Sequence, residues 1–509
     1  MQAFSIEQSI IDGKNQLQDL FKFAENMSVS LEAYEMEKAI FDRLMKIGLS
    51  AMMAYFASKG TGDIGPEIVL EDGTPMKRQS GLYGRNYFSV FGKLNVPRTC
   101  YRGSNPEGIM PLDAMANLPE RCYSYLLQEW INILSVRNSF KEAEISLSKL
   151  MGLKIAQSRF EVITRESAIN YDEFYDQKSI PDAAEEGEIQ VLSFDGKGVP
   201  VIKKEAAKIK ARLDKGEKKQ KKKEAMVGVS YTVEPNIRTP EEVAGNLVYP
   251  EQSKQGGADT NKTHSAPIKA KNIRRMASLE RTKEEIVKEI VKDAERRDPD
   301  KGRAWVVVMD GALHLWTLIA SVLQGIDYIG VLDIIHVVEY LWDAANTLNK
   351  REKIDRHKWV YKHLLSILKG DVGRVIAGLK QIITKNQKAK NKLTKKQIKE
   401  LQKVITYFEN HRPWMQYDKY LEAGYPIGSG VVESTCGHTV KDRMEGTGRR
   451  WSIKGAESIL LLRSIYTSHD WDSYWLSHMI AQKEKKYEGV LNASYNTSDD
   501  YSKKEVVFA

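Results

Sequence analysis

The chain has 509 residues and carries 77 Lys and Arg against 68 Asp and Glu, a formal net charge of +9. Hydrophobic residues make up 42% of it, which excludes wholesale disorder, and at about 150 residues per domain the length excludes a single small module. The longest uncharged apolar stretch, residues 311–326, is shorter than the roughly 18 residues that span a bilayer, so we expect no membrane segment.

The N-terminal sequence MQAFSIEQSIIDGKNQ lacks the basic start and apolar core of a secretory signal. The three cysteines of the chain are too few and too scattered for a disulfide framework or a paired zinc site; they are Cys100, Cys122 and Cys436. We therefore expect a cytoplasmic protein, and any metal must rely on oxygen ligands.

Positive charge is concentrated in two segments. Residues 203–224 carry a net charge of +7 and residues 380–403 a net charge of +8, which leaves the rest of the chain at −6. Such clusters attract polyanions and gain affinity from released counterions, so nucleic acid is the leading partner. The alternative is that each run is simply a solvated loop or helix face.

The first 60 or so residues have helical periodicity, and a β-hairpin is expected around Gly92. Ser139 and Glu142 form a capping box that opens a helix ending at Gly152, and a second helix begins near Ala156. This pair fits a helix-turn-helix. Its second helix would present three side chains to a DNA groove, namely Gln157, Arg159 and Arg165. A helical hairpin that only packs is an equally good interpretation.

From residue 189 onward the pattern changes to alternating strands and helices. Strands are expected at 189–195, 225–235, 304–309 and 327–335, with helices at 279–297, 311–325 and 336–348, and the polar segment 256–267 is expected to be a loop. Residues 351–420 are almost entirely helical and Lys-rich, as in an insertion, and a Gly-rich turn at 428–430 leads into a later helix.

Three acidic residues are candidates for the chemistry. Asp195 and Asp310 each end a predicted strand in an Asp-Gly step, where ligands of open α/β sheets bind, although Asp-Gly is also an ordinary turn signal. Glu433 lies three residues after Gly430, and a small and apolar stripe on its helix predicts that it points inward, where it needs a cation or a hydrogen-bonding partner. The alternative is a solvent-facing glutamate.

These residues resemble the DDE transposases of bacterial insertion sequences, closest to the ISKra group and related to Mutator-like elements. The resemblance rests on LSFDGKGVP, VVVMDG, the step from Asp333 to His336 and YPIGSGVVESTCGHTVKDRMEGTGRRW, and it covers about 87–475. It implies an α/β fold: an RNase H-like catalytic domain with an all-α insertion, preceded by a mainly helical DNA-binding region with a small β-hairpin.

The resemblance also assigns roles. It makes Asp195, Asp310 and Glu433 the catalytic triad, which holds two Mg²⁺, with Mn²⁺ able to replace them, while Asp333 and His336 lie near the cleaved strand. His336 is equally well interpreted as a structural histidine. The resemblance implies double-stranded DNA as the partner, both the terminal repeats of the element and the target. It also implies a location in the bacterial cytosol or nucleoid, no contact with a membrane, and a homodimer or higher homo-oligomer.

Basic residues follow Glu433 closely and are candidates for phosphate contacts, with an aromatic residue to pack on a base or sugar. They are Lys441, Arg443, Arg449, Arg450 and Trp451. A solvated basic helix end is the competing interpretation. Two other functions stay open: a transposase-derived DNA-binding regulator, and an RNase H-like nuclease without strand transfer.

The expected domain boundaries follow from these patterns. They are a helical region (1–78), a β-hairpin segment (79–113), a helix-turn-helix-like DNA-binding region (114–180), the first part of the catalytic domain (185–350, with a Lys-rich insertion at 203–224), an all-α insertion (351–423), the final catalytic helices (424–482) and a polar tail (483–509).

Overall fold

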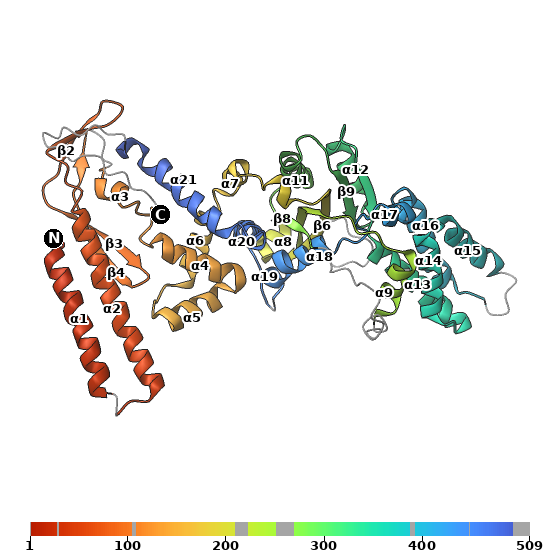
Figure 1. Ribbon diagram of the computed structural model, residues 1–509, viewed down its shortest axis with the longest axis horizontal. Coiled ribbons are helices and arrows are strands. Elements are labelled where there is room, and N and C mark those ends of the chain that lie inside the picture. The colour runs from red at the N-terminus through yellow and green to blue at the C-terminus, as the bar shows by residue number, and fades with distance from the viewer. Residues whose placement is uncertain are drawn as a thin grey trace. The chain divides into compact units, whose positions relative to one another are not determined.

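The computed structural model describes residues 2–27, 30–103, 108–208, 222–250, 269–386, 392–446 and 448–491. The chain divides into two compact units. Unit 1 comprises Met1–Asp176 and Trp471–Ala509, and unit 2 comprises Gln177–Asp470 (Figure 1). No helix in the described ranges combines the length and the apolar character that crossing a bilayer requires.

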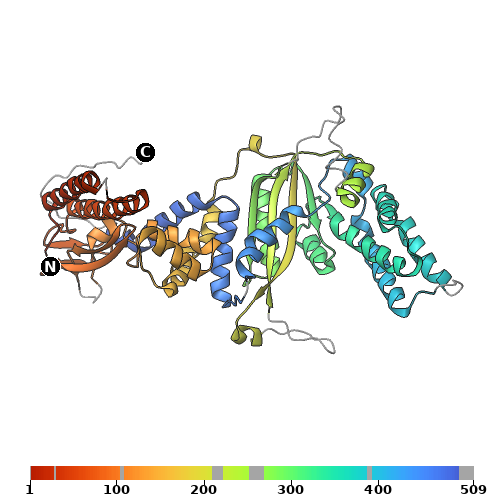
Figure 2. The same ribbon diagram turned by 90° about the horizontal axis from the view of Figure 1, so that it is seen from below.

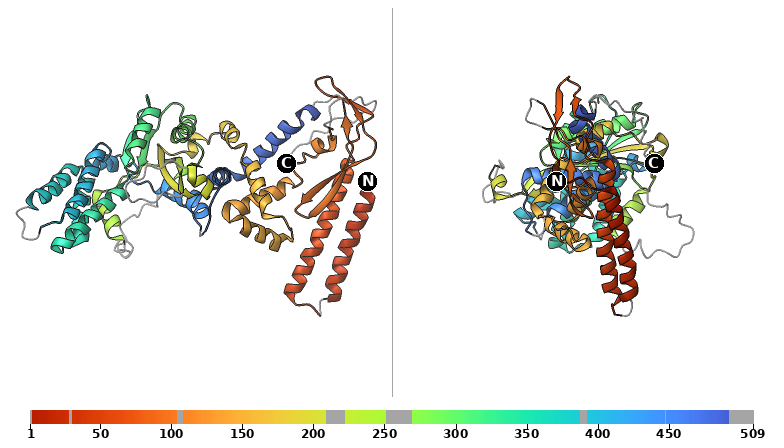
Figure 3. Two further views of the ribbon diagram at one scale, coloured as in Figure 1. Left: turned by 180° about the vertical axis from the view of Figure 1, so that it is seen from behind. Right: turned by 90° about the vertical axis from the view of Figure 1, so that its left-hand side faces the viewer.

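Unit 1 begins with two long helices, α1 (Ile6–Met27) and α2 (Ala33–Lys59), which confirm the predicted helical start. They pack side by side along their length, as Figures 1 and 3 show from opposite directions. Ser50 on α2 donates a 3.0 Å hydrogen bond to Gln16 on α1, and the guanidinium of Arg43 lies 3.5 Å from the ring centroid of Phe23. These contacts fix an antiparallel helical hairpin.

A small β region follows the hairpin. The predicted β-hairpin is confirmed as β3 (Tyr83–Ser89) paired with β4 (Gly92–Arg98). Three short strands that the sequence did not predict form a second sheet in the order β1-β2-β5, with bounds Glu67–Val69, Pro75–Arg78 and Tyr101–Arg102. Helix α3 (Pro111–Met115) follows.

Three helices then share one apolar core: α4 (Tyr125–Arg137), α5 (Phe140–Met151) and α6 (Gln157–Ser167). The capping box between Ser139 and Glu142 is present, and Gly152 ends α5 with φ +69°, a left-handed conformation that glycine adopts without strain. Both predicted helices of the helix-turn-helix-like pair are therefore confirmed as helices. Helix α7 (Tyr171–Gln177) completes this part of the chain.

The C-terminal helix α21 (Trp471–Leu491) belongs to unit 1, which corrects the predicted division into final catalytic helices and a polar tail from 483. Tyr474 and Tyr487 are buried, and their hydroxyls donate to the carbonyl oxygens of Ser167 and Leu118. His478 hydrogen-bonds Asn170. The polar composition after residue 483 predicts a tail, but Tyr487 in this segment is buried and holds the helix in unit 1.

Unit 2 is built on a mixed sheet that, within the described residues, has five strands in the order β10-β9-β6-β7-β8. The strands are β6 (Ile189–Pro200), β7 (Lys222–Val233), β8 (Lys271–Ser278), β9 (Ala304–Met309) and β10 (Ile329–Leu332). The first three form an antiparallel meander, and β9 and β10 run parallel to β6. The sequence therefore predicted an α/β sheet correctly.

Helices cover both faces of this sheet. Helix α11 (Lys283–Arg297) covers one face, where Ile286 and Ile290 approach Gly228 of β7. On the other face lie α18 (Gly430–Thr435), a π-helical segment (Cys436–Lys441) and α19 (Asp442–Met444), visible in Figure 2 as a blue helical segment across the strands. Helix α20 (Ile453–Thr467) packs against β8.

The sheet contains one strand that the sequence did not predict, and one predicted boundary differs. Strand β8 precedes the helix that the sequence pattern placed from Leu279. The pattern did not indicate a strand, because Arg274 and Arg275 interrupt its apolar alternation. In the fold Arg274 is buried, and the backbone of Arg275 donates to the hydroxyl of Ser468. The Lys-rich insertion ends earlier than 224, since β7 begins at Lys222. Helix α8 (Lys203–Lys208) starts that insertion, and 209–221 and the predicted loop 256–267 lie outside the described residues.

The helical segment after β10 begins with α13 (Ile334–Glu352) and continues with α14 (Arg356–Leu368), α15 (Val372–Lys385), α16 (Lys395–His411) and α17 (Tyr417–Glu422). The predicted helical character is confirmed, whereas the role of this segment as an inserted domain stays a prediction. Helices α14 and α16 pack on α13, and α9 (Pro240–Val248) packs on α14. Helix α12 (Leu313–Val322) connects β9 to β10.

Candidate active site

Asp195 and Asp310 come from adjacent parallel strands. The pairing of β6 with β9 ends at Leu192 opposite Val307, and the same register continued by three residues sets Asp195 opposite Asp310. Asp310 directly follows β9, as predicted. Asp195 does not end its strand, because β6 continues to Pro200 in its antiparallel pairing with β7. The prediction of two strand ends is corrected to one strand end beside one continuing strand.

The turn that carries Asp310 is held by side chains from two helices. Asp310 Oδ1 accepts a 3.1 Å hydrogen bond from the backbone of Ala312, and the indole of Trp316 on α12 donates to the Asp310 carbonyl over 2.9 Å. His411 Nε2 on α16 lies 2.8 Å from the Gly311 carbonyl. A Cβ at residue 311 would collide with the ring of Tyr407, so only glycine fits there.

The neighbouring strand end is held in the same way from α17. The hydroxyl of Tyr417 donates 2.7 Å to the carbonyl of Leu332, and Tyr420 donates 2.9 Å to the carbonyl of Gly330. Backbone carbonyls at the ends of β9 and β10 are thus satisfied by the helical segment 351–423 rather than by water. This segment therefore fixes the backbone from which Asp310 and Asp333 project.

Asp333 is fully buried and caps helix α13. It accepts hydrogen bonds from the backbone of Ile335 at 3.0 Å and from the hydroxyl of Ser429 at 2.7 Å. Ser429 is the residue just before α18, so Asp333 ties the Gly-rich turn to the sheet. These hydrogen bonds satisfy the buried carboxylate, and the expected place of Asp333 near the cleaved strand stays a prediction.

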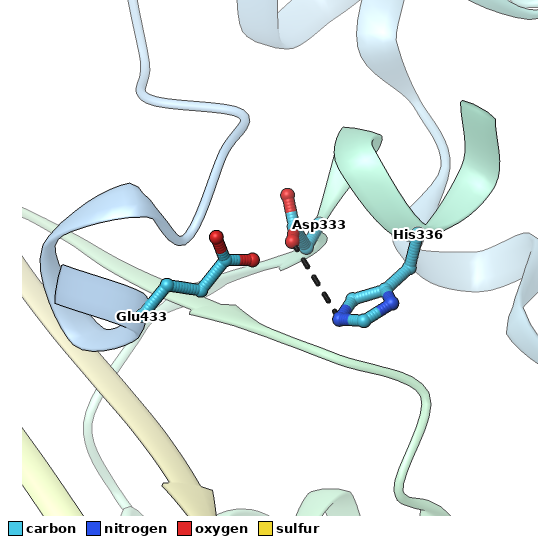
Figure 4. Close-up of side chains that lie close together, drawn as sticks. All are labelled: Asp333, His336 and Glu433. Carbon is cyan, nitrogen blue, oxygen red and sulfur yellow. Dashed lines mark ion pairs between the residues drawn. The ribbon is translucent and has the colours of Figure 1, made fainter. Parts of the chain in front are cut away.

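Asp333, His336 and Glu433 form a compact group whose ligand atoms all lie within 4.8 Å of one another. Figure 4 shows Glu433 projecting from α18 toward Asp333, with His336 on the other side of Asp333. His336 Nε2 lies 3.9 Å from Asp333 Oδ2, and its Nδ1 lies 3.1 Å from Glu339. Carboxylate oxygens and an imidazole nitrogen are competent ligands for a divalent cation.

The side chain of Glu433 is exposed, which corrects the prediction that it points into the core. The buried stripe of this helical segment consists of Val432, Thr435, Cys436, Thr439 and Val440. Because Val432 and Cys436 face the sheet, Glu433 lies on the flank of α18, and the π-helical turns after Thr435 move the later residues out of the regular 3.6-residue phase. Glu433 still has partners at the site, because its Oε1 lies 3.2 Å from the Ser429 hydroxyl and its carboxylate belongs to the group with the buried Asp333.

Cys436 is a site residue that the sequence interpretation missed. Its Sγ lies 3.1 Å from Oδ2 of Asp195, one turn beyond Glu433. The contact links the helix that carries Glu433 to the strand that carries Asp195. The spacing carries part of this signal, because Cys436 lies three residues after Glu433 and residues three apart on a helix are neighbours, but it does not contain the contact with Asp195.

The electrostatics of the group indicate an excess of negative charge. Burial raises the pKa of Asp310, and the charges of Asp195 and Asp333 raise it further, while His336 opposes them. Burial and then the charge of Asp333 likewise raise the pKa of Glu433. Burial and Asp195 hold the pKa of the Cys436 thiol far above its usual range, so the thiol stays protonated and donates.

The donor set fits a hard divalent cation. Asp195, Asp310 and Glu433 supply carboxylate oxygens at one edge of the sheet, and the like charges that raise two of their pKa values are the repulsion that a bound cation relieves. The compact group that includes Glu433 contains neither Asp195 nor Asp310. Asp310 thus interacts electrostatically with Asp195 and Asp333, and Glu433 with Asp333, so that the three predicted acids are related through Asp333 and do not form one tight cluster.

Two of the predicted DNA contacts are buried instead. Arg443 is 1% exposed and its guanidinium lies 4.5 Å from the ring centroid of Trp451. The Trp451 indole donates to the carbonyl of Met444, and its backbone bridges to Val201 beyond β6. These side chains have no path to a phosphate or base, because they join the end of α19 to the sheet. Their predicted contact roles are therefore corrected.

The other basic candidates differ in exposure. Lys441 and Arg450 are exposed, and Arg449 is half-buried with its guanidinium donating to the carbonyl of Arg443 over 2.8 Å. In unit 1, the three predicted DNA contacts on α6 are exposed, namely Gln157, Arg159 and Arg165. Their exposure is compatible with DNA binding, which stays a prediction.

Comparisons with known proteins give a distant structural likeness. No family model matches the chain, and no curated protein matches it. A solved structure, the Drosophila P element transposase strand transfer complex, aligns over 70% of this chain and 80% of that one with a TM-score of 0.23 and 8% sequence identity.

Proposed function

We propose that this chain is the DNA transposase of an insertion sequence, which binds element ends and catalyses metal-dependent strand cleavage and strand transfer. The sheet supports the RNase H-like part of the proposal. An antiparallel meander of three strands followed by two strands parallel to the first, in the order β10-β9-β6-β7-β8, is the arrangement that this fold requires.

One observation carries the proposal. Asp195 and Asp310 lie 115 residues apart in the chain, yet each follows by three residues the last pair, Leu192 with Val307, of the adjacent parallel strands β6 and β9, and the charge of Asp195 raises the pKa of Asp310. Glu433, a further 123 residues along, is joined to the same neighbourhood through Cys436 and Asp333. Three acids from distant segments at one sheet edge are the donor set of a two-metal phosphoryl-transfer site.

In this function Asp195, Asp310 and Glu433 would hold the cations. Bound Mg²⁺ supplies activation of the attacking oxygen and stabilisation of the leaving oxygen in an in-line displacement. The protein contributes positioning. His411 and Trp316 fix the Asp310 turn, Ser429 and Asp333 fix the start of α18, and Cys436 orients the Asp195 carboxylate. The solvent-facing Glu433 leaves room for a DNA phosphate beside it.

DNA binding would use exposed cations. Lys395, Lys399 and Lys403 are exposed on α16 at intervals of four residues and so share one face. Lys441 and Arg450 are exposed in the segment after α18. Counterion release from phosphates would give such contacts a strong dependence on salt.

The test is a cleavage and joining assay with DNA that carries the element's own ends. With Mg²⁺ or Mn²⁺, the wild-type protein should cut the element end and join the freed 3′-OH to target DNA, and Asp195→Ala should abolish both reactions while DNA affinity is retained. Asp300→Ala, at an exposed aspartate that precedes β9 and so lies at the opposite end of that strand from Asp310, is the matched control and should react normally. Normal reaction by Asp195→Ala would refute the proposal.

The same assay separates the alternatives. Cleavage without joining indicates an RNase H-like nuclease, and specific binding without cleavage indicates a DNA-binding regulator. The neighbourhood of acids with raised pKa values favours an enzyme over a regulator, because uncompensated like charges cost stability and serve no purpose in binding a polyanion.

A further inference from the structure

Helix α1 exposes a row of large apolar side chains. Ile6, Ile10, Leu17 and Phe21 are between 43% and 68% exposed. Relative to Ile6 they stand at +4, +11 and +15, and at 3.6 residues per turn these positions fall within about 60° of one another. They therefore form one continuous stripe. An exposed apolar stripe of this kind marks an interaction site.

Helix α2 extends the stripe. Leu44 and Tyr55 are also exposed, and they stand eleven residues apart, which leaves them within about 20° of each other. The contact line between the helices passes through Gln16 and Arg43, each of which touches the opposite helix. Leu17 directly follows Gln16, and Leu44 directly follows Arg43, so each leucine is rotated about 100° about its helix axis from the contact line. In an antiparallel pair of helices, equal rotations of this kind place both side chains on the same side of the hairpin.

The area of this face is sufficient for an interface. Each of the six side chains leaves about 100 Å² exposed, judged from full areas of about 150–250 Å² for large apolar residues, so they offer about 600 Å² per copy. A stable interface buries about 800 Å² on each partner. The six side chains alone supply about three quarters of that, and the polar residues at their border supply the remainder.

The spacing of the stripe on α1 is symmetric. Ile6 and Phe21 are equidistant from the midpoint between residues 13 and 14, and so are Ile10 and Leu17. A two-fold axis through that midpoint therefore places Ile6 against Phe21 of a second copy and Ile10 against Leu17. Such self-complementarity is what an isologous dimer contact requires. Lys14, at the border of the stripe, keeps its ammonium in solvent at the end of its four-carbon stem.

We propose that this face, defined by Ile6, Ile10, Leu17 and Phe21 on α1 and flanked by Leu44 and Tyr55 on α2, is a homodimer interface. Two copies of the hairpin pack α1 against α1 in antiparallel register and form a four-helix assembly. The inference stands apart from the proposed chemistry, since it depends on α1 and α2 and on none of the acids.

The first test is sedimentation of the full-length chain without DNA or metal, from submicromolar to tens of micromolar concentration. The wild type should reach twice 57.9 kDa. Leu17→Glu should raise the dimer dissociation constant about 100-fold or more, because each dimer loses two buried leucines. Leu126→Glu, at a similarly exposed leucine on α4, should leave the constant unchanged.

The second test fixes the register and does not depend on the folding of a charged variant. Ile10→Cys combined with Leu17→Cys should form a covalent dimer on mild oxidation. Seven residues of helix separate the two positions by about 10 Å, beyond the roughly 7 Å reach of a disulfide, so the bond must join two chains. Ile10→Cys combined with Gln18→Cys, on another face of α1, should form far less.

A wild-type mass of 57.9 kDa at every concentration would overturn the proposal, and that is the mass expected if the chain's own residues 492–509 cover the stripe. A dimer that Leu17→Glu leaves intact would overturn it too.

Discussion

His411 Nε2 lies 2.8 Å from the carbonyl oxygen of Gly311, and its Nδ1 lies 2.6 Å from the carbonyl oxygen of Tyr407. The ring is buried, and it joins the last turn of α16 to the residue after Asp310. A helix that lies 100 residues further along the chain thus determines where a candidate catalytic carboxylate projects. This gives the helical segment after β10 a structural role in the site.

We predict that His411→Ala lowers the rate of metal-dependent cleavage by about 10- to 100-fold, because loss of the contact lets the Asp310 turn shift by a fraction of an ångström. DNA affinity should stay within about twofold, since no DNA contact is removed. His411→Asn, which keeps one side-chain donor, should restore part of the rate. Equal losses in binding and cleavage would show that the residue only maintains the fold.

Asp310→Asn should stabilise the metal-free protein at pH 7. The pKa of Asp310 is raised by burial and by Asp195 and Asp333, so the folded state holds its proton more tightly than the unfolded state does. Between the ordinary value of 3.8 and the raised value, stability falls as pH rises, and at pH 7 the wild type carries the full penalty. The gain is about 1 kcal/mol, because contact with solvent screens part of the repulsion.

Urea unfolding in EDTA measures this difference. The advantage of Asp310→Asn should be largest at pH 7, should shrink as the pH falls through the raised pKa, and should vanish well below 3.8, where Asp310 of the wild type is protonated in both states. Asp300→Asn, at an exposed position, should show no such dependence. An Asp310→Asn variant that is less stable than the wild type at pH 7 would contradict the like-charge interpretation.

Replacing Lys395, Lys399 and Lys403 together by Gln should weaken DNA binding and flatten its salt dependence. Each phosphate contact on duplex DNA contributes about 0.9 to the slope of log Kobs against log salt, so the slope should fall by about two to three. Fluorescence anisotropy across a salt series measures it. Lys358→Gln on α14 is the control and should keep the slope of the wild type. A triple variant with the slope of the wild type would show that α16 does not contact DNA.

The sheet was largely predictable because its strongest strands are unambiguous. Residues 304–309 are apolar on both faces, as in a strand covered by helices on both sides, and β9 is buried throughout. Strand β8 was not predictable, since Arg274 and Arg275 interrupt the apolar pattern and depend on tertiary contacts for their burial. A local sequence pattern contains no information about a hydrogen-bond partner such as Ser468, which lies almost 200 residues further along the chain.

The site shows the same division. Motif resemblance selected Asp195, Asp310 and Glu433, and the first two each follow by three residues the last pair of the parallel strands β6 and β9. The orientation of Glu433 could not be derived from a regular helical period, because the helix that carries it changes to π-helical turns at Cys436. The burial of Arg443 and Trp451 depends on a bridge to Val201, which sequence spacing does not contain.

The central claim is that Asp195, Asp310 and Glu433 together bind a divalent cation. Calorimetric titration of the metal-free protein with Mn²⁺ tests it most directly, using Asp195→Asn, Asp310→Asn and Glu433→Gln, with Asp300→Asn as the control. The account predicts that the wild type and the control bind Mn²⁺ alike and that each of the three site variants binds at least about tenfold more weakly, because each loses a charged ligand. Equal Mn²⁺ affinity in the wild type and all three site variants would contradict it.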